Sequence, residues 1–256
     1  MSDLFSLKGK TAVIIGGNST LARSVAEGFV EHGARIASVV MKAELGTEVE
    51  EQIQAMGGEI QSFVADVTVQ DSIQRAADEI WDWAKSIDIL LYAPGLNSST
   101  PFFDLKMDEW DAIMDVNLKG LVMTSQIFAK KMIAQKTGGS IINISSVSSG
   151  PPLSRVFTYS ASKAAVNSVT QFLARELAPH NIRVNAIIPG FFPAEQNRKI
   201  LTDERVADIM RHTPVNRYGK PEELKGVTVW LASEKASSYV TGSLVRVDGG
   251  FGAMTI

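Results

Sequence analysis

The chain has 256 residues, of which 45% are hydrophobic and 21% are charged, and its net charge is −3. This composition supports a buried core, and the small negative charge argues against a surface that neutralises nucleic-acid phosphates. The chain has no cysteine, which excludes disulfides and thiolate catalysis, and no apolar run long enough to cross a membrane, so we expect a cytoplasmic protein without membrane or nucleic-acid partners.

Short β-branched runs alternate with longer segments of helical period from residue 11 onward. This alternation is typical of a mostly parallel sheet with helices on both faces. We expect strands at 11–15, 35–40, 61–65, 87–92, 140–145, 183–188 and 244–247. We expect helices at 21–32, 45–56, 72–85, 108–135, 157–178 and 221–231. These elements predict one α/β domain over residues 1–256 with a Rossmann-like, doubly wound, seven-stranded sheet, and they leave 190–216 as a candidate substrate lid.

The first strand leads into a glycine-bearing turn that opens a helix, where free amide groups can hold a pyrophosphate. Thr20 and Ala22 stand where the dinucleotide fingerprint has its second and third glycines. A purely structural turn is therefore as consistent with this segment as a nucleotide site is. The candidate cofactor ligands in the turn are Gly16, Asn18, Ser19, Thr20 and Leu21.

The second strand ends at Met41 and Lys42, without the acidic residue that would bind the ribose hydroxyls of NAD. Lys42 could meet a 2′-phosphate or be a solvated loop charge, so the site favours NADP(H) slightly over NAD(H). Asp66 and Val67 follow the third strand, and the Asp66 carboxylate could receive the adenine amino group.

A phenol and an ammonium stand four residues apart at Tyr159 and Lys163, on one face of the expected fifth helix. A unit charge about 5 Å away is worth roughly 3 kcal/mol, which would lower the tyrosine pKa by about two units. A packing tyrosine beside a surface lysine is the alternative interpretation.

Three other features lie where the strands of such a sheet end and form a ligand crevice. Ser145 and Ser146 end the fifth strand, and a hydroxyl there could bind a substrate carbonyl. Asn117 interrupts the long helix expected before that strand, where a side-chain amide can disturb the backbone ladder and hold a water. The third feature is the Pro189-Gly190 turn after the sixth strand.

From Lys10 to Gly250 the chain resembles the short-chain dehydrogenase/reductase family, on its Tyr-x-x-x-Lys element and the serine thirteen residues upstream. The resemblance implies an NAD(P)-dependent oxidoreductase whose nicotinamide supplies hydride. The resemblance implies that Tyr159 gives a proton to the substrate's carbonyl oxygen and that Ser146 is the hydrogen-bond partner of that oxygen. Lys163 would act as modulator and ribose ligand, and Asn117 would anchor a relay water.

The family resemblance also implies a homodimer or homotetramer and further cofactor contacts. Tyr92-Ala93-Pro94 replaces the family's usual Asn-Asn-Ala after the fourth strand. The further cofactor contacts are Ala93, Pro94, Gly95, Pro189, Gly190 and Phe192, together with Tyr159 and Lys163.

The segment after Pro189 resembles the loop of sugar-acid oxidoreductases in the family, notably D-mannonate oxidoreductases and gluconate 5-dehydrogenases. Arg198 could bind a substrate carboxylate and Gln196 a hydroxyl, with Ser146 and Phe191 as further substrate contacts. Surface charges on a lid helix are an equal alternative.

The sequence leaves two other functions open: a reductase of lipid-like, acyl or xenobiotic ketones, and a non-catalytic nucleotide sensor or scaffold. The histidines have no ligand-like spacing with carboxylates, so we expect no metal site.

Overall fold

Seven strands form one sheet in the order β3-β2-β1-β4-β5-β6-β7, and every neighbouring pair is parallel in this computed structural model, which describes residues 3–192 and 202–253. The strands are β1 (Thr11–Ile15), β2 (Arg35–Val40), β3 (Ile60–Val64), β4 (Ile89–Tyr92), β5 (Gly139–Ile144), β6 (Ile182–Pro189) and β7 (Leu244–Val247). The predicted fold class is confirmed.

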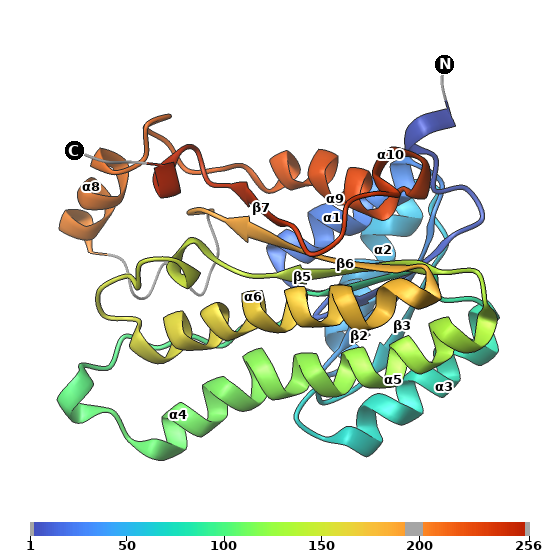
Figure 1. Ribbon diagram of the computed structural model, residues 1–256, viewed down its shortest axis with the longest axis horizontal. Helices are drawn as coiled ribbons and strands as arrows, with labels where there is room; N and C mark the ends of the chain where they lie inside the picture. Colours follow the sequence, from blue (N-terminus) through green and yellow to red (C-terminus); the bar gives the residue numbers. More distant parts are fainter. Residues whose placement is uncertain (1–2, 193–201, 254–256) are drawn as a thin grey trace.

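Helices cover both faces of the sheet (Figure 1). One face carries α3 (Gln70–Ala84), α4 (Met107–Met114), α5 (Gly120–Gln135) and α6 (Phe157–Leu177). The other carries α1 (Thr20–Glu31), α2 (Ala43–Ala55), α9 (Lys225–Ala232) and α10 (Glu234–Ser237). Every residue of β1 and β6 is buried, as expected for strands packed on both sides. Within the described ranges, no helix is long and apolar enough to span a bilayer.

Two helical features near the candidate site differ from the sequence-based prediction, and the short helix α10 was not predicted. The single helix expected over 108–135 is α4 and α5 joined by a π turn, η3 (Asp115–Lys119). The lid region expected to be irregular contains α8 (Asp203–Arg211), whose first turn is capped by the Thr202 hydroxyl. The sequence signal for α8 was present, because a threonine cap followed by two acidic residues is a typical helix start.

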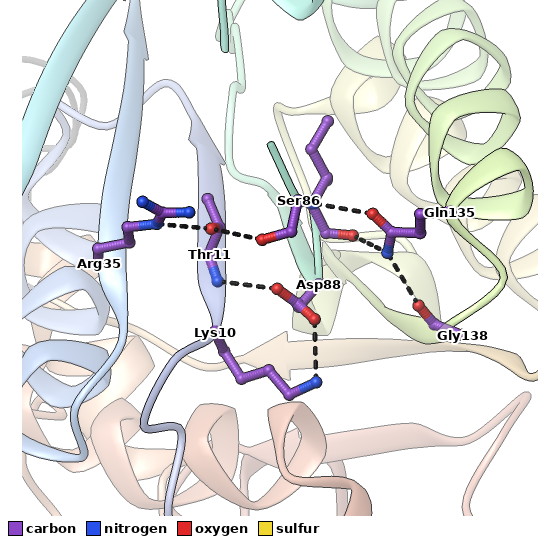
Figure 2. Close-up of polar contacts among 8 residues, drawn as sticks. Lys10, Thr11, Arg35, Ser86, Asp88, Gln135 and Gly138 are labelled. Atoms are coloured by element: carbon purple, nitrogen blue, oxygen red, sulfur yellow. Dashed lines mark hydrogen bonds and ion pairs between the residues drawn. The ribbon is translucent and has the colours of Figure 1, made fainter. Parts of the chain in front are cut away.

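Polar side chains join the amino ends of the central strands (Figure 2). Asp88 accepts hydrogen bonds from the Thr11 main chain at 3.0 Å and from Lys10 Nζ at 2.9 Å. The Gln135 side chain accepts from Ile87 N–H at 3.0 Å and donates to Ile87 O at 2.7 Å. These contacts fix the start of β1 against β4 and α5, at the edge opposite the candidate site.

The carboxyl ends of the strands form the opposite edge, where α8 also lies (Figure 1). The chain adds β2 and β3 on one side of β1 and then adds β4 to β7 on the other, and such a switch point in strand order is where open α/β sheets bind ligands. The turns after β1 and β4 touch, because a Cβ added to Gly16 would lie 3.2 Å from Pro94.

Candidate active site

The turn after β1 presents unpaired amide groups at the start of α1. Gly16 has φ +73°, and its N–H donates to the Val39 carbonyl at 2.9 Å. Ser19 Oγ caps α1 by accepting from Ala22 N–H. The N–H groups of Thr20 and Leu21 have no acceptor within residues 3–192 and 202–253. These two groups, with the positive end of the helix dipole, fit a phosphate.

The altered fingerprint positions are explained by packing. Ala22 is buried in the core between α1 and the sheet, so a methyl group fits where the fingerprint has its third glycine. Thr20 is exposed at the first position of α1, in the second glycine's place. Gly17 is the tightly packed glycine here, because an added Cβ would collide with Ser38 Oγ.

The residues after β2 and β3 lie along the same edge. Met41 and Lys42 are exposed, with Lys42 in the N-cap position of α2. Asp66 Oδ1 accepts from Thr68 N–H at 2.8 Å and from Thr68 Oγ1 at 2.7 Å. No described residue bonds Asp66 Oδ2, so this oxygen can receive an amino group, whereas the neighbouring Val67 is buried.

Ser146 and Tyr159 come from different elements, the end of β5 and the first turn of α6. Ser146 Oγ accepts from Ser148 N–H at 3.2 Å and from Ser148 Oγ at 3.1 Å. Because both acceptor positions are taken, the Ser146 hydrogen is the one available to donate, and it faces the Tyr159 oxygen, where a substrate oxygen could also receive it. Ser148 was not among the residues predicted from the sequence, since nothing in its spacing indicated this contact.

Burial raises the pKa of the half-buried Tyr159, and hydrogen bonding with Ser146 only partly opposes the rise. The prediction that Lys163 brings this pKa toward neutrality is not met in this structure. Lys163 Nζ lies 5.7 Å from the centre of the Tyr159 ring and donates to the Ile144 carbonyl at 2.8 Å. Lys163 is itself desolvated, and burial lowers its pKa to about 8. Tyr159 is therefore held in its protonated form, the form required of a proton donor.

Lys163 also faces the turn after β4. Among the described residues, a Cβ added to Gly95 would meet only Lys163 Nζ, at 3.8 Å, so this glycine leaves space beside the ammonium. Ala93 N–H continues the sheet by donating to Ile15 O at 3.1 Å. The structure thus brings the predicted Ala93, Pro94 and Gly95 together with Gly16 and Lys163 at the switch point.

Asn117 is fully buried inside the π turn. Its Oδ1 accepts from Leu96 N–H at 2.7 Å, while its Nδ2 donates to Leu96 O and to Ser162 Oγ, both at 2.9 Å. The predicted break in the helix is confirmed. The side-chain amide is not free to hold a water, however, because protein groups surround and bond it; a relay water would have to bind main-chain groups of the turn.

Between β6 and Thr202, only the first residues, up to Phe192, lie within the described part of the chain. A Cβ on Gly190 would lie 2.7 Å from Asp248 Cα, so glycine is required beside β7. The Phe192 ring is buried against Gly219, so its side chain packs into the protein interior. Phe191 packs edge-on against Phe251, with ring centres 5.2 Å apart. The predicted substrate residues Gln196 and Arg198 lie outside the described residues.

Comparison with known proteins gives full-length matches. A family model described as enoyl-(acyl carrier protein) reductase matches residues 16–252. The uncharacterized oxidoreductase UxuB of Bacillus subtilis is 36% identical, covering 96% of each chain. The 2-dehydro-3-deoxy-D-gluconate 5-dehydrogenase of Escherichia coli is 39% identical, covering 96% of this chain and 97% of the relative.

A solved structure gives the same picture. The gluconate 5-dehydrogenase of Burkholderia cenocepacia, in complex with NADP and tartrate, superposes with a TM-score of 0.94 at 32% identity, covering 99% of each chain.

Proposed function

The chain belongs to the short-chain dehydrogenase/reductase family and is an NAD(P)-dependent oxidoreductase acting on a small molecule, and we propose that its substrate is a sugar acid, a keto-aldonate such as fructuronate or the corresponding hydroxy acid. The observation that carries this proposal is the gluconate-type chemistry in the names of two relatives that match over nearly their whole length.

The unpaired amides of Thr20 and Leu21, and the open space beside Gly95, fit a nicotinamide dinucleotide. When bound, this group supplies the hydride that reduces the carbonyl carbon. We propose that Thr20 and Leu21 hold the pyrophosphate and that Asp66 receives the adenine amino group. We further propose NADP(H) over NAD(H), because exposed Lys42 replaces the acidic ribose ligand.

In the proposed mechanism, the protein's residues polarise the substrate carbonyl and protonate its oxygen. Ser146 donates its hydroxyl hydrogen to that oxygen, and Tyr159 delivers the phenolic proton to the same oxygen as the carbon becomes tetrahedral. Lys163 binds the ribose and maintains a positive charge beside the phenol. Main-chain groups near Asn117 hold a water that returns a proton from solvent.

Substrate selection is assigned to the segment after β6. We propose that Arg198 binds the carboxylate in a two-pronged contact, that Gln196 reads a hydroxyl, and that Phe191 forms a wall of the pocket. The lid would span 190–216, including α8, within one catalytic domain covering residues 1–256.

The test is a titration with NADH and NADPH followed by a panel of keto acids and ketones. We expect NADPH to bind more tightly than NADH, and Lys42→Ala to weaken NADPH binding while leaving NADH binding unchanged.

In the substrate panel we expect turnover of a keto-aldonate. We expect kcat to fall about 10²–10⁴-fold in Tyr159→Phe and KM to rise in Arg198→Ala. Full activity in Tyr159→Phe would reject the proton donor, and an unchanged KM in Arg198→Ala would reject the carboxylate contact. Failure to bind either nucleotide would instead favour a scaffold.

A second candidate is a reductase of acyl or other lipid-like ketones. The description of the matching family model and the apolar Phe191–Phe251 pair favour it. Turnover of acyl ketones with no turnover of keto acids in the same panel would support this alternative over the first.

We also propose a homo-oligomer assembled through the α5–α6 face and the edge strand β7. Phe157 and Phe172 on α6 are 44% and 53% exposed, and β7 is only half-buried. Large exposed apolar side chains and an uncovered strand edge are typical of interfaces. Light scattering that gives a monomer mass at micromolar concentration would reject this assembly.

A further inference from the structure

Tyr92 is a buried tyrosine at the end of β4 to which the mechanism above assigns no role. Its side chain is 1% exposed, and its hydroxyl donates a 2.5 Å hydrogen bond to the main-chain oxygen of Val116. Burial raises the pKa of Tyr92, so the phenol keeps its proton. This bond joins the switch-point strand to the π turn that contains Asn117.

The π turn removes the α-helical donor from the Val116 oxygen. In an α-helix the Gly120 N–H would donate to the carbonyl four residues back, which is that of Val116. Here the Gly120 N–H donates to Asp115 O, five residues back. The Tyr92 hydroxyl therefore donates to the Val116 oxygen, which has lost the Gly120 N–H as its donor. A buried carbonyl without a donor is unfavourable.

Gly120 makes room for the phenol. A Cβ at this position would lie 2.6 Å from Tyr92 Oη and 2.8 Å from the Val67 carbonyl oxygen. Glycine weakens a helix interior, so its presence at the junction of the π turn and α5 calls for a packing reason. The hydroxyl of Tyr92 is part of that reason.

We propose that Tyr92, seated against Gly120, is a positioning residue that sets the π turn and thereby the location of Asn117. The proposal rests on the relay role given, under the proposed function, to the main chain near Asn117. Asn117 follows Val116 directly and hydrogen-bonds Ser162, the residue before Lys163. A displacement of Val116 is thus transmitted to the main chain at Asn117 and to the contact with α6.

The test is Tyr92→Phe, which removes only the hydroxyl, assayed with the best substrate of the panel. We expect kcat to fall about tenfold while KM and the NADPH Kd change by less than about twofold. In an Asn117→Ala background the same change should have little further effect, because both residues act through one turn. Amides 115–121 should exchange faster with deuterium.

An unchanged kcat in Tyr92→Phe, or an equal fold-loss in both backgrounds, would overturn the proposal. A fall in kcat in Asn117→Ala with no fall in Tyr92→Phe would reject Tyr92 alone. Full activity in Asn117→Ala would show that catalysis does not depend on how this turn is held, and would reject the positioning role. Ile73→Val in α3 is the control for a comparable loss of stability and should leave kcat and exchange at 115–121 unchanged.

Gly120→Ala, which displaces the phenol but keeps its hydroxyl, should lower kcat without raising KM. A wild-type kcat in Gly120→Ala would also count against the proposal.

Discussion

Lys163 Nζ donates a 2.8 Å hydrogen bond to the main-chain oxygen of Ile144, the last residue of β5. The bond ties α6 to the strand whose next residues are Ser145 and Ser146. It places the ammonium near the Tyr159 ring without a direct bond to the phenol. The tyrosine and serine of the site are therefore positioned by a lysine that is almost wholly removed from water.

The desolvated Lys163 predicts a pH-dependent stability. Its pKa is lowered to about 8 in the folded protein, against about 10.4 when unfolded, so between these values the unfolded chain binds more protons and stability rises with pH. Urea unfolding without nucleotide should show a Lys163 contribution that increases by about 2 kcal/mol from pH 8 to pH 10. Lys163→Met should lack this increase; equal pH slopes for the two proteins would contradict it.

Ser148 is predicted to orient Ser146. In Ser148→Ala the Ser146 oxygen keeps the main-chain donor but loses the hydroxyl donor at 3.1 Å. Its own hydrogen is then less strongly directed outward, and kcat should fall about fivefold with nucleotide affinity unchanged. Ser168→Ala, an exposed serine of α6, is the matched control. Steady-state kinetics decides, and a kcat equal to that of the control would refute the role.

Gly17 and Ser38 form a testable packing pair. Gly17→Ala would drive its Cβ into Ser38 Oγ and should destabilise the protein by about 1–3 kcal/mol. Ser38 Oγ is buried without a hydrogen-bond partner among the described residues, so Ser38→Ala alone should be neutral or stabilising. The double variant should recover most of the loss in thermal unfolding. Additive effects would show that the collision is not the cause.

Asp88 should affect stability without affecting catalysis, because its contacts with Lys10 and Thr11 (Figure 2) lie at the amino ends of the strands, opposite the site. Asp88→Ala leaves the buried Thr11 N–H unpaired and should cost about 2–3 kcal/mol. Lys10→Met removes only the half-exposed partner and should cost less than about 1 kcal/mol. Denaturant unfolding measures both, and a changed kcat in either folded variant would argue that the two edges are coupled.

The sequence by itself determined the sheet and indicated the reacting groups proposed here. Strand periodicity located β1, β2 and β7 to the residue, and the spacing of Ser146, Tyr159 and Lys163 indicated the proposed chemistry, because these patterns depend on residue types a fixed distance apart along one chain. Strand ends elsewhere shifted by a residue or two, as expected where hydrogen bonding frays.

Tertiary structure alone decided how those groups are supported. The sequence indicated a break at Asn117 but not that a π turn forms there, nor the bond from Tyr92 to Val116 or the contact of Ser148 with Ser146, because these depend on which carbonyl or hydroxyl the folded chain brings within reach. The direction of the Tyr159 pKa shift was likewise set by burial, which sequence spacing does not report. The nearby Lys163 charge predicted a lowered Tyr159 pKa, whereas removal of the phenol from water in the folded protein raises that pKa.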